Sequence, residues 1–349
     1  MTEKIIIREL KTSDYRKLAE FNSNFPGDSL SVEQWLERFK YWWDENPAFI
    51  DSWHRGFILL DNFKIVGFVG SFPTLFKTGN EIIRVFNGTT WRVLDDYRNF
   101  SIELWEYNRR VSSHYISFNT TPTEFVSNLI RKFHYKLLPW GSEQESFYVV
   151  DPNNFLKSRK LPLAILLRPL LYILIIVRQS CIRSLKIPYE YIELNEADAF
   201  FDELWINTSR YIKYTNVRDC NCVNWYSHNK ILMGIYCQGH LIGYSIFMIN
   251  GRTENYILQI VDFWVDHSYN LDQILSGFLQ AVRVIALERK CYIIKFPHFS
   301  KEINRSFTKI RLLKHNIKRS NFFFIPHDIQ DDFNTGNSYF TLLQGDYGS

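Results

Sequence analysis

Glycine and cysteine are scarce in this 349-residue chain, which holds 15 Gly and 5 Cys. So few glycines exclude a glycine-rich fibrous or low-complexity protein. The cysteine count is odd, no Cys-x-x-Cys pair occurs, and the opening residues 1–9 are too short and too charged for a secretory signal. We therefore expect reduced thiols in a cytoplasmic protein, with no disulfide framework and no metal site.

A large excess of one charge is also absent. The 41 basic and 37 acidic side chains leave a formal net charge of +4, whereas a nucleic-acid-binding protein is expected to carry a clustered basic face. Apolar residues make up 46% of the chain and aromatic residues 17%. This content excludes general disorder and can bury two sizeable cores. At roughly 150 residues per domain, the length predicts about two domains.

The predicted elements occur twice in the same order: strand, helix, hairpin, long strand, helix, strand, helix. The long strand lies at 84–94 in the first half and at 256–265 in the second, and the helices that follow lie at 101–111 and 271–288. The sequence Ser31-Val32-Glu33-Gln34 fits a capping box and predicts that a helix begins there. The order predicts an α+β protein of two similar domains, each a mixed, mostly antiparallel sheet flanked by helices.

The segment between the two copies contains no acidic residue. We place the N-terminal domain at 1–155, a helical linker at 156–189 and the C-terminal domain at 190–349. The linker carries seven Lys or Arg side chains, and residues 161–177 are apolar apart from Arg168. Because a membrane-spanning helix needs about 20 apolar residues, we expect a buried interdomain helix. The alternative is a peripheral membrane or carrier-protein contact through 157–186.

The most informative stretch is 93–104, where a long strand turns directly into a helix through Asp95-Asp96-Tyr97-Arg98-Asn99. The first amides of a helix have no backbone partners, and the helix dipole favours an anion there. The turn therefore suits a pyrophosphate, to which Arg98 would add positive charge. An ordinary strand-to-helix turn is the alternative.

This stretch resembles the pyrophosphate loop of the GNAT superfamily of acyl-CoA N-acyltransferases, which reads Arg/Gln-x-x-Gly-x-Gly/Ala after the fourth strand. Arg98 matches, whereas Ser101 and Glu103 replace the usual small residues. The resemblance implies two tandem GNAT-like domains, with acyl-CoA as co-substrate and no tightly bound cofactor. It also implies a V-shaped gap for the pantetheine arm beside the fifth strand. The coenzyme A contacts that we expect are Trp91, Arg92, Val93, Arg98, Asn99, Phe100, Ser101, Ile102, Asn119 and Thr120. A Tyr that serves many relatives as acid toward the departing thiolate is Ile130 here.

The second copy lacks the loop, since its counterpart at 266–270 has neither Arg nor Gly. We expect it to supply acceptor contacts through Arg218, Trp225 and Tyr226, with Asp219 and Asp262 as catalytic candidates. An unpaired carboxylate in an apolar strand is costly, so Asp262 either pairs with an Arg such as Arg218 or contacts the acceptor amine. Trp225 is either a core residue or a stacking face. The general base is left open between Asp219, Asp262 and a water.

The second-copy cluster, together with the closing segment 339–346, resembles tandem GNAT proteins of bacterial surface-polysaccharide pathways. That resemblance implies transfer of an acyl group from acyl-CoA to the amine of a dTDP- or UDP-linked amino deoxy sugar, for O-antigen or capsule synthesis. The amine would attack the thioester directly, without a covalent acyl-enzyme. One alternative is a carrier-protein or aminoacyl-tRNA dependent transferase acting on a wall precursor. The other is a non-catalytic acyl-CoA-binding module.

Overall fold

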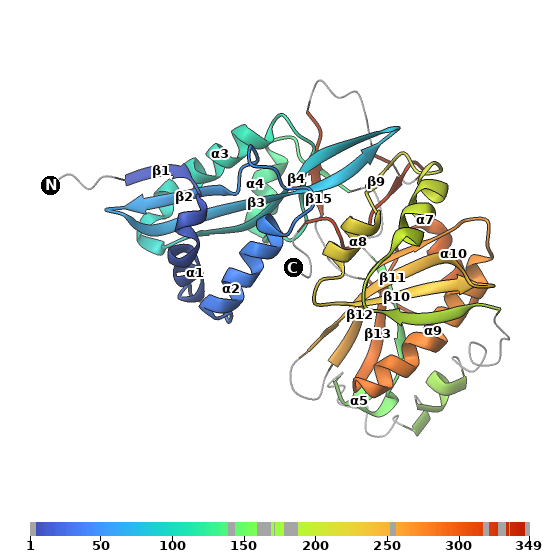
Figure 1. Ribbon diagram of the computed structural model, residues 1–349. Coiled ribbons are helices and arrows are strands. Elements are labelled where there is room, and N and C mark those ends of the chain that lie inside the picture. Colours follow the sequence, from blue (N-terminus) through green and yellow to red (C-terminus); the bar gives the residue numbers. More distant parts are fainter. Residues whose placement is uncertain are drawn as a thin grey trace. The chain divides into compact units, whose positions relative to one another are not determined.

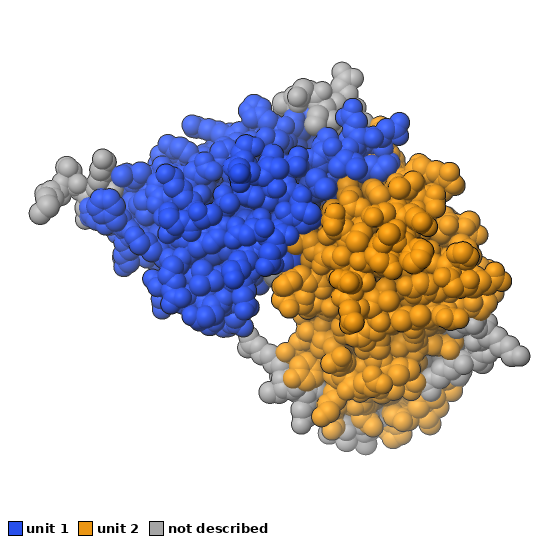
Figure 2. Space-filling view, viewed as in Figure 1, with its two compact units in different colours: residues 1–138, 320–332, 344–349 blue, residues 139–319, 333–343 orange. Residues whose placement is uncertain are grey.

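The computed structural model describes residues 5–138, 144–158, 169–170, 172–177, 188–251, 256–316, 321–326, 333–334 and 336–345. The chain divides into two compact units, each built on its own mixed sheet with flanking helices (Figures 1 and 2). Unit 1 comprises residues 1–138, 320–332 and 344–349, and unit 2 comprises residues 139–319 and 333–343. The predicted α+β class is confirmed.

Unit 1 contains most of the first half of the chain. Its strands are β1 (Ile5–Glu9), β2 (Gly56–Asp61), β3 (Lys64–Thr78), β4 (Glu81–Val93), β5 (Ser117–Asn119), β6 (Lys136–Leu137) and β15 (Phe322–Phe324). Its α-helices are α1 (Tyr15–Ser23), α2 (Val32–Phe39), α3 (Ser101–Ser112) and α4 (Glu124–Arg131). Short 3₁₀ helices span Thr12–Asp14 and Asp95–Phe100, and a π-helical turn spans Lys40–Asp44. Ser31 caps α2 and forms the predicted capping box with Gln34.

The unit 1 sheet has the order β1-β2-β3-β4-β5-β15-β6. Helices α1 and α2 lie on one face, and α3 and α4 lie on the other (Figure 1). The core under α3 contains Leu59, Val93 and Leu104, and Gly67 allows this close approach. A Cβ at Gly67 would lie 3.0 to 3.3 Å from these three side chains. Strands β4 and β5 are parallel, unlike the other neighbours along this order.

Unit 2 repeats this architecture. Its strands are β7 (Gln144–Val149), β8 (Glu190–Leu194), β9 (Tyr214–Asn216), β10 (Ile231–Cys237), β11 (His240–Asn250), β12 (Tyr256–Val265), β13 (Cys291–Pro297), β14 (Leu313–Asn316) and β16 (Ser338–Tyr339). Its helices are α5 (Pro152–Ser158), α7 (Ala199–Ser209), α8 (Cys220–Tyr226), α9 (Leu271–Glu288) and α10 (Lys301–Lys309). The sheet order is β14-β7-β13-β12-β11-β10-β8, in which β12 and β13 form the parallel pair.

The two units exchange strands, so they do not coincide with contiguous halves of the chain. Strand β7, from the first half, pairs with β13 and β14 in unit 2. Strand β15, from the second half, pairs with β5 and β6 in unit 1. We expected the N-terminal domain to end at residue 155, whereas the first segment of unit 1 ends at residue 138 and two later segments return to that unit. Residue alternation predicts that a segment is a strand, but both copies offer equivalent sheet edges for it to join.

The linker is described only in part. Residues 169–170 and 172–177 are helical, and Ile175 packs in a core cluster of unit 2 with Phe147 and Phe155. The expected burial is therefore restricted to one side of this helix, because Leu170 and Ile173 are exposed. Arg159, Lys160, Arg168, Arg178, Arg183 and Lys186 lie outside the described residues, as does Asp346. Among the residues that the structure describes, none of the helices combines the length and apolar character that crossing a bilayer requires.

Candidate functional site

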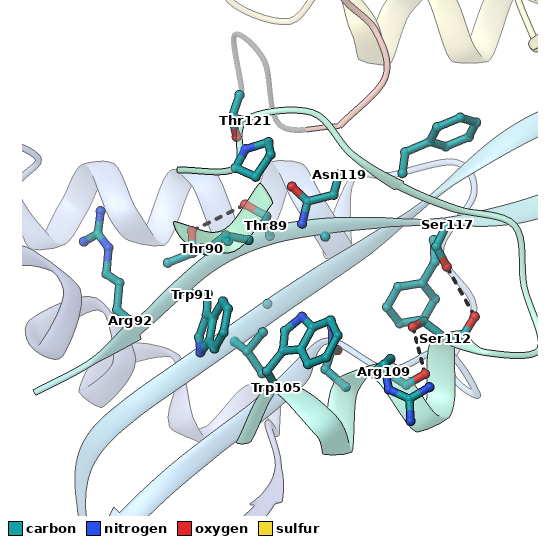
Figure 3. A pocket seen from close by; sticks show the side chains of 18 of the residues that line it. Thr89, Thr90, Trp91, Arg92, Trp105, Arg109, Ser112, Ser117, Asn119 and Thr121 are labelled. Atoms are coloured by element: carbon teal, nitrogen blue, oxygen red, sulfur yellow. Dashed lines mark hydrogen bonds between the residues drawn. The ribbon is translucent and has the colours of Figure 1, made fainter. Parts of the chain in front are cut away.

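Strands β4 and β5 separate after two paired residues and leave a pocket in unit 1 (Figure 3). Phe86 pairs with Ser117 and Asn87 with Phe118. Beyond Asn87, the edge of β4 that faces β5 has no strand partner among the described residues. The pocket here measures about 370 Å³, and it is lined by residues of α2, α3, β3, β4 and β5. It therefore reaches both faces of the sheet through the gap between the strands.

Strand β4 carries one extra residue at this gap. Val69 of β3 pairs with Trp91, but the next residue, Gly70, pairs with Thr89. Thr90 is thus bulged, and its φ of 35° lies in the left-handed region. A bulge re-aims the backbone and side chains of its strand, and positive φ in a β-branched residue is costly enough to indicate a constrained site. The irregularity therefore lies in the pocket wall itself.

Helix α3 contributes a polar face to the wall. Trp105, Asn108, Arg109 and Ser112 are spaced so that they share one side of the helix, and all four line the pocket. The Oδ1 atom of Asn108 is buried and has no hydrogen-bond partner among the described residues, and the same holds for Nε1 of Trp91. Such atoms cost about 1–3 kcal/mol each unless something bonds to them. Both atoms are enclosed within the pocket wall rather than open to the pocket.

Positive charge dominates the wall. Arg38, Arg92 and Arg109 line the pocket, and the described lining residues include no Asp, Glu or His. Arg92 pairs with Asp28 at 2.7 Å and Arg109 with Glu106 at 2.8 Å. In Figure 3, Trp91 and Trp105 lie side by side, whereas Arg92 points away from them. The pocket combines aromatic surface with cationic groups and suits an anionic ligand.

Tyr135 also lines the pocket. Burial raises the pKa of its phenol, while hydrogen bonds with Ser117 and Ser112 act in the opposite direction. The side chain is therefore neutral at physiological pH. Ile130, at the position where the resemblance implied an acidic Tyr, is fully buried in the core.

The structure brings three of the ten predicted coenzyme A contacts to the pocket: Trp91, Arg92 and Asn119. Val93 lies in the core instead, and Thr120 is buried. Arg98 is exposed and pairs with Asp95 at 2.8 Å. The remaining four precede or begin α3 outside the pocket wall: Asn99, Phe100, Ser101 and Ile102. Sequence reasoning missed the wall residues of α3, although a polar stripe on a sheet-packing helix is a usable signal.

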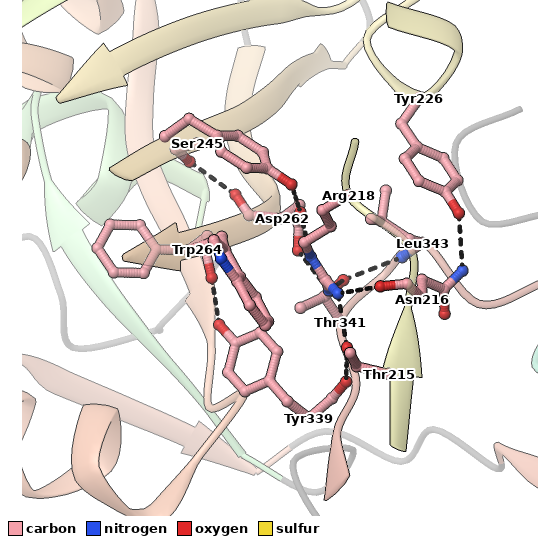
Figure 4. A network of polar contacts seen from close by, with 12 residues as sticks. Thr215, Asn216, Arg218, Tyr226, Ser245, Asp262, Trp264, Tyr339, Thr341 and Leu343 are labelled. Carbon is pink, nitrogen blue, oxygen red and sulfur yellow. Dashed lines mark hydrogen bonds and ion pairs between the residues drawn. The ribbon is translucent and has the colours of Figure 1, made fainter. Parts of the chain in front are cut away.

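In unit 2, Arg218 and Asp262 form a completely buried ion pair (Figure 4). Two hydrogen bonds of 3.0 and 3.1 Å join them, and the hydroxyl of Tyr244 donates to the same carboxylate at 2.8 Å. Arg218 also donates to Thr215 Oγ1 at 2.6 Å. Of the two alternatives for Asp262, the structure shows the pairing with Arg218. Its carboxylate has no exposed surface from which to reach an acceptor amine.

The other predicted acceptor residues also have structural partners. Asp219 caps α8 and accepts a hydrogen bond from the amide of Cys222 at 2.8 Å. Tyr226 is buried, and its hydroxyl accepts a bond from Asn216 at 3.0 Å. Trp225 is buried beside it. Asp219 therefore stabilises the start of α8, and the spacing of Trp225 and Tyr226 along α8 buries both side chains in unit 2.

The position in unit 2 that corresponds to the pocket is filled by the chain itself. Strand β12 has an extra residue, Val261, where its register against β11 shifts. The amide of Leu342 donates to the carbonyl of Val261 at 2.9 Å, and the hydroxyl of Tyr339 donates to the carbonyl of Phe263. The two copies therefore share a bulged strand, but in unit 2 the segment 339–342 bonds to it, whereas in unit 1 the pocket opens beside it.

Comparisons with known proteins give a match at the level of fold. No protein-family model matches the sequence, and no curated protein matches it either. The structure of Saccharomyces cerevisiae N-myristoyltransferase with bound myristoyl-CoA is similar at a TM-score of 0.57 and 10% identity, covering 93% of this chain and 79% of that one. A GCN5-related N-acetyltransferase from Anabaena variabilis is similar at a TM-score of 0.57 and 13% identity, covering 92% of this chain and 72% of that one. A probable N-acyltransferase from Enterococcus faecalis is similar at a TM-score of 0.59 and 10% identity, covering 92% of this chain and 73% of that one. The chain thus has the two-domain fold of GNAT-like N-acyltransferases.

Proposed function

We propose that this protein is an acyl-CoA-dependent N-acyltransferase whose donor site is the unit 1 pocket. The observation that carries the proposal is the gap between β4 and β5 beside the bulged residue Thr90. The shared fold supports it, because the similar proteins are N-acyltransferases and one of them was solved with myristoyl-CoA bound. The resemblance of the Arg98 loop to a pyrophosphate loop supports it independently.

The pantetheine arm of the donor would lie in the gap, with the pyrophosphate at the start of α3 near Arg98. Backbone amides of β4 at the bulge of Thr90 would donate to the thioester oxygen and stabilise the negative charge that develops there.

The amine would attack the thioester carbon as its neutral form, the carbon–sulfur bond would break, and the nitrogen would release one proton while the departing thiolate takes one up. No described lining residue is a carboxylate or a histidine, so we propose that the ammonium loses its proton to water. The value of kcat/KM for the acceptor should then rise with pH up to the pKa of the acceptor amine, which is about 8 for an ordinary α-amine. Tyr135, held neutral by burial, is our proposed proton donor to the thiolate.

The acceptor we propose is the amine of a dTDP- or UDP-linked amino deoxy sugar, with a role in O-antigen or capsule synthesis. The resemblance of the sequence to tandem GNAT proteins of those pathways supports this choice. So do Arg38 and Arg92, whose guanidinium carbons lie 5.1 and 5.2 Å from the ring centre of Trp35 in the pocket wall. Guanidinium groups are suited to bind diphosphate oxygens.

The test begins with calorimetric titration of the full chain with coenzyme A. We expect one site per chain, because the equivalent position in unit 2 is filled. Thiol release from acetyl-CoA and longer acyl-CoAs is then measured with nucleotide-linked amino sugars, and with the same sugars lacking the nucleotide. Release only with the nucleotide-linked amines supports the full proposal. Release with other amines overturns the acceptor assignment alone, and absence of coenzyme A binding overturns the proposal.

A further inference from the structure

The described part of the linker helix, residues 169–170 and 172–177, presents an apolar face to the outside. Leu170, Ile173, Leu174 and Val177 follow the i, i+3, i+4, i+7 spacing of one helix face and are 56%, 57%, 54% and 61% exposed. Ile175, on the opposite side, is 7% exposed and belongs to a unit 2 core cluster. The helix is therefore anchored by one side and exposes the other. Soluble surface helices normally expose a polar face instead.

Charge accompanies this face in the sequence. The segment 156–189 has seven Lys or Arg residues and no Asp or Glu, and Arg168 and Arg178 directly flank residues 169–177. Those nine residues contain no ionisable side chain except Tyr172. Apolar side chains beside clustered positive charge are the signature of helices that lie in the interface of an anionic bilayer.

We propose that the face formed by Leu170, Ile173, Leu174 and Val177 binds the surface of an anionic lipid bilayer. At 1.5 Å per residue, the eight described helical residues account for about 12 Å, and the nine-residue apolar run between Arg168 and Arg178 is too short to cross a hydrocarbon core of about 30 Å. The helix would thus lie in the headgroup region rather than cross it. Ile175 would hold the helix on unit 2, and the positive charge of the surrounding sequence would favour anionic lipid.

Two other occupants fit the same observations less well. A second copy of the chain would bring two seven-charge segments of the same sign together, and repulsion would oppose such an interface. An acidic carrier protein would satisfy the charges, but an acidic surface offers little apolar area to cover the four exposed side chains. The bilayer satisfies both the charges and the apolar face. This inference does not depend on the proposed enzymatic activity.

The experiment is co-sedimentation of the full chain with vesicles of phosphatidylcholine and phosphatidylglycerol (3:1), compared with vesicles of phosphatidylcholine alone. We expect binding to the anionic vesicles that weakens with added salt, and at least roughly tenfold weaker binding to the neutral ones. Ile173→Ser/Leu174→Ser should weaken binding by roughly tenfold or more. Arg178→Ser/Arg183→Ser/Lys186→Ser should weaken it roughly a hundredfold, or about fivefold per charge.

The matched control is Val284→Ser/Leu287→Ser, which removes two exposed apolar residues from α9 of the same unit. It should bind vesicles like the parent, and thermal unfolding should show that each variant is folded. Absence of vesicle binding overturns the proposal, as does equal loss in the control variant. Self-association that Ile173→Ser/Leu174→Ser abolishes, without vesicle binding, would identify a second copy as the occupant. Binding to an acyl carrier protein but not to vesicles would identify that protein instead.

Discussion

Arg218 donates to both carboxylate oxygens of Asp262, at 3.0 and 3.1 Å, and neither side chain has any exposed surface. Removing one member of such a pair leaves a buried charge without its partner. We expect Asp262→Asn to lower the free energy of unfolding by about 3–5 kcal/mol. Chemical denaturation followed by circular dichroism measures this change.

Asp219→Asn is the matched control, because it removes one negative charge near the same pair but leaves a good helix cap on α8. Its free energy of unfolding should stay close to that of the parent. The double variant Arg218→Met/Asp262→Leu should lose less stability than Asp262→Asn, since no buried charge is left unpaired. Equal losses in Asp262→Asn and Asp219→Asn would contradict the structural role of Asp262.

Gly88 offers a direct test of the pocket. A Cβ there would meet Asn119 Nδ2 at 3.6 Å and the Phe118 carbonyl at 3.7 Å, which are ordinary contacts. Gly88→Val should therefore fold normally, because Val suits a strand, while its methyl groups narrow the gap. We expect coenzyme A to bind at least roughly tenfold more weakly, an effect of about 1.4 kcal/mol.

Calorimetric titration measures that affinity, and thermal unfolding checks the fold. Gly88→Ala should have a smaller effect on affinity, because it adds only one carbon to the wall. Unchanged affinity in Gly88→Val would place the donor site elsewhere.

Arg98 tests whether the start of α3 receives the donor's pyrophosphate. Arg98→Glu reverses a charge that is exposed and pairs only weakly with Asp95. We expect the KM for acyl-CoA to rise by roughly tenfold or more, with kcat less affected.

The matched variant is Arg110→Glu, which makes the same charge reversal at the opposite end of α3. Steady-state kinetics should show a much smaller change in KM for it. If both variants change KM equally, the effect follows from the net charge of the protein, and the Arg98 loop does not bind the pyrophosphate specifically.

His298 predicts acid sensitivity of unit 2. Burial lowers the pKa of its imidazole to about 4, and the side chain shares a 2.8 Å hydrogen bond with Ser146 of β7. The unfolded chain, with an ordinary His pKa of about 6.5, binds this proton more readily than the folded one. The free energy of unfolding should therefore fall as pH decreases from about 6.5 to about 4, and this contribution should level off below that range.

His298→Gln does not titrate and keeps a polar group beside Ser146. Its loss of stability between pH 7 and pH 4, measured by urea unfolding at each pH, should be smaller than that of the parent. Identical pH dependence in the two proteins would show that His298 has the same pKa in the folded and the unfolded chain.

The sequence by itself determined the order and kind of the main elements. Runs of apolar residues predicted the long strands at 84–94 and 256–265, which correspond to β4 and β12, and the capping box at Ser31 and Gln34 predicted the start of α2. These signals are local, because side-chain period and helix capping depend on residues a few positions apart. The duplicated order also indicated the α+β class, and the approximate place of the gap beside Asn119 followed from the resemblance.

Only the tertiary structure decided which distant residues meet. It assigned β7 and β15 to sheets outside their own halves of the chain, paired Arg218 with Asp262, and turned Asn108 and Tyr135 toward the pocket. Strand partners and buried polar contacts depend on which surfaces compete to cover an edge or a charge. That competition is settled over the whole fold, because the free energy of burial depends on the completed environment rather than on neighbours in sequence.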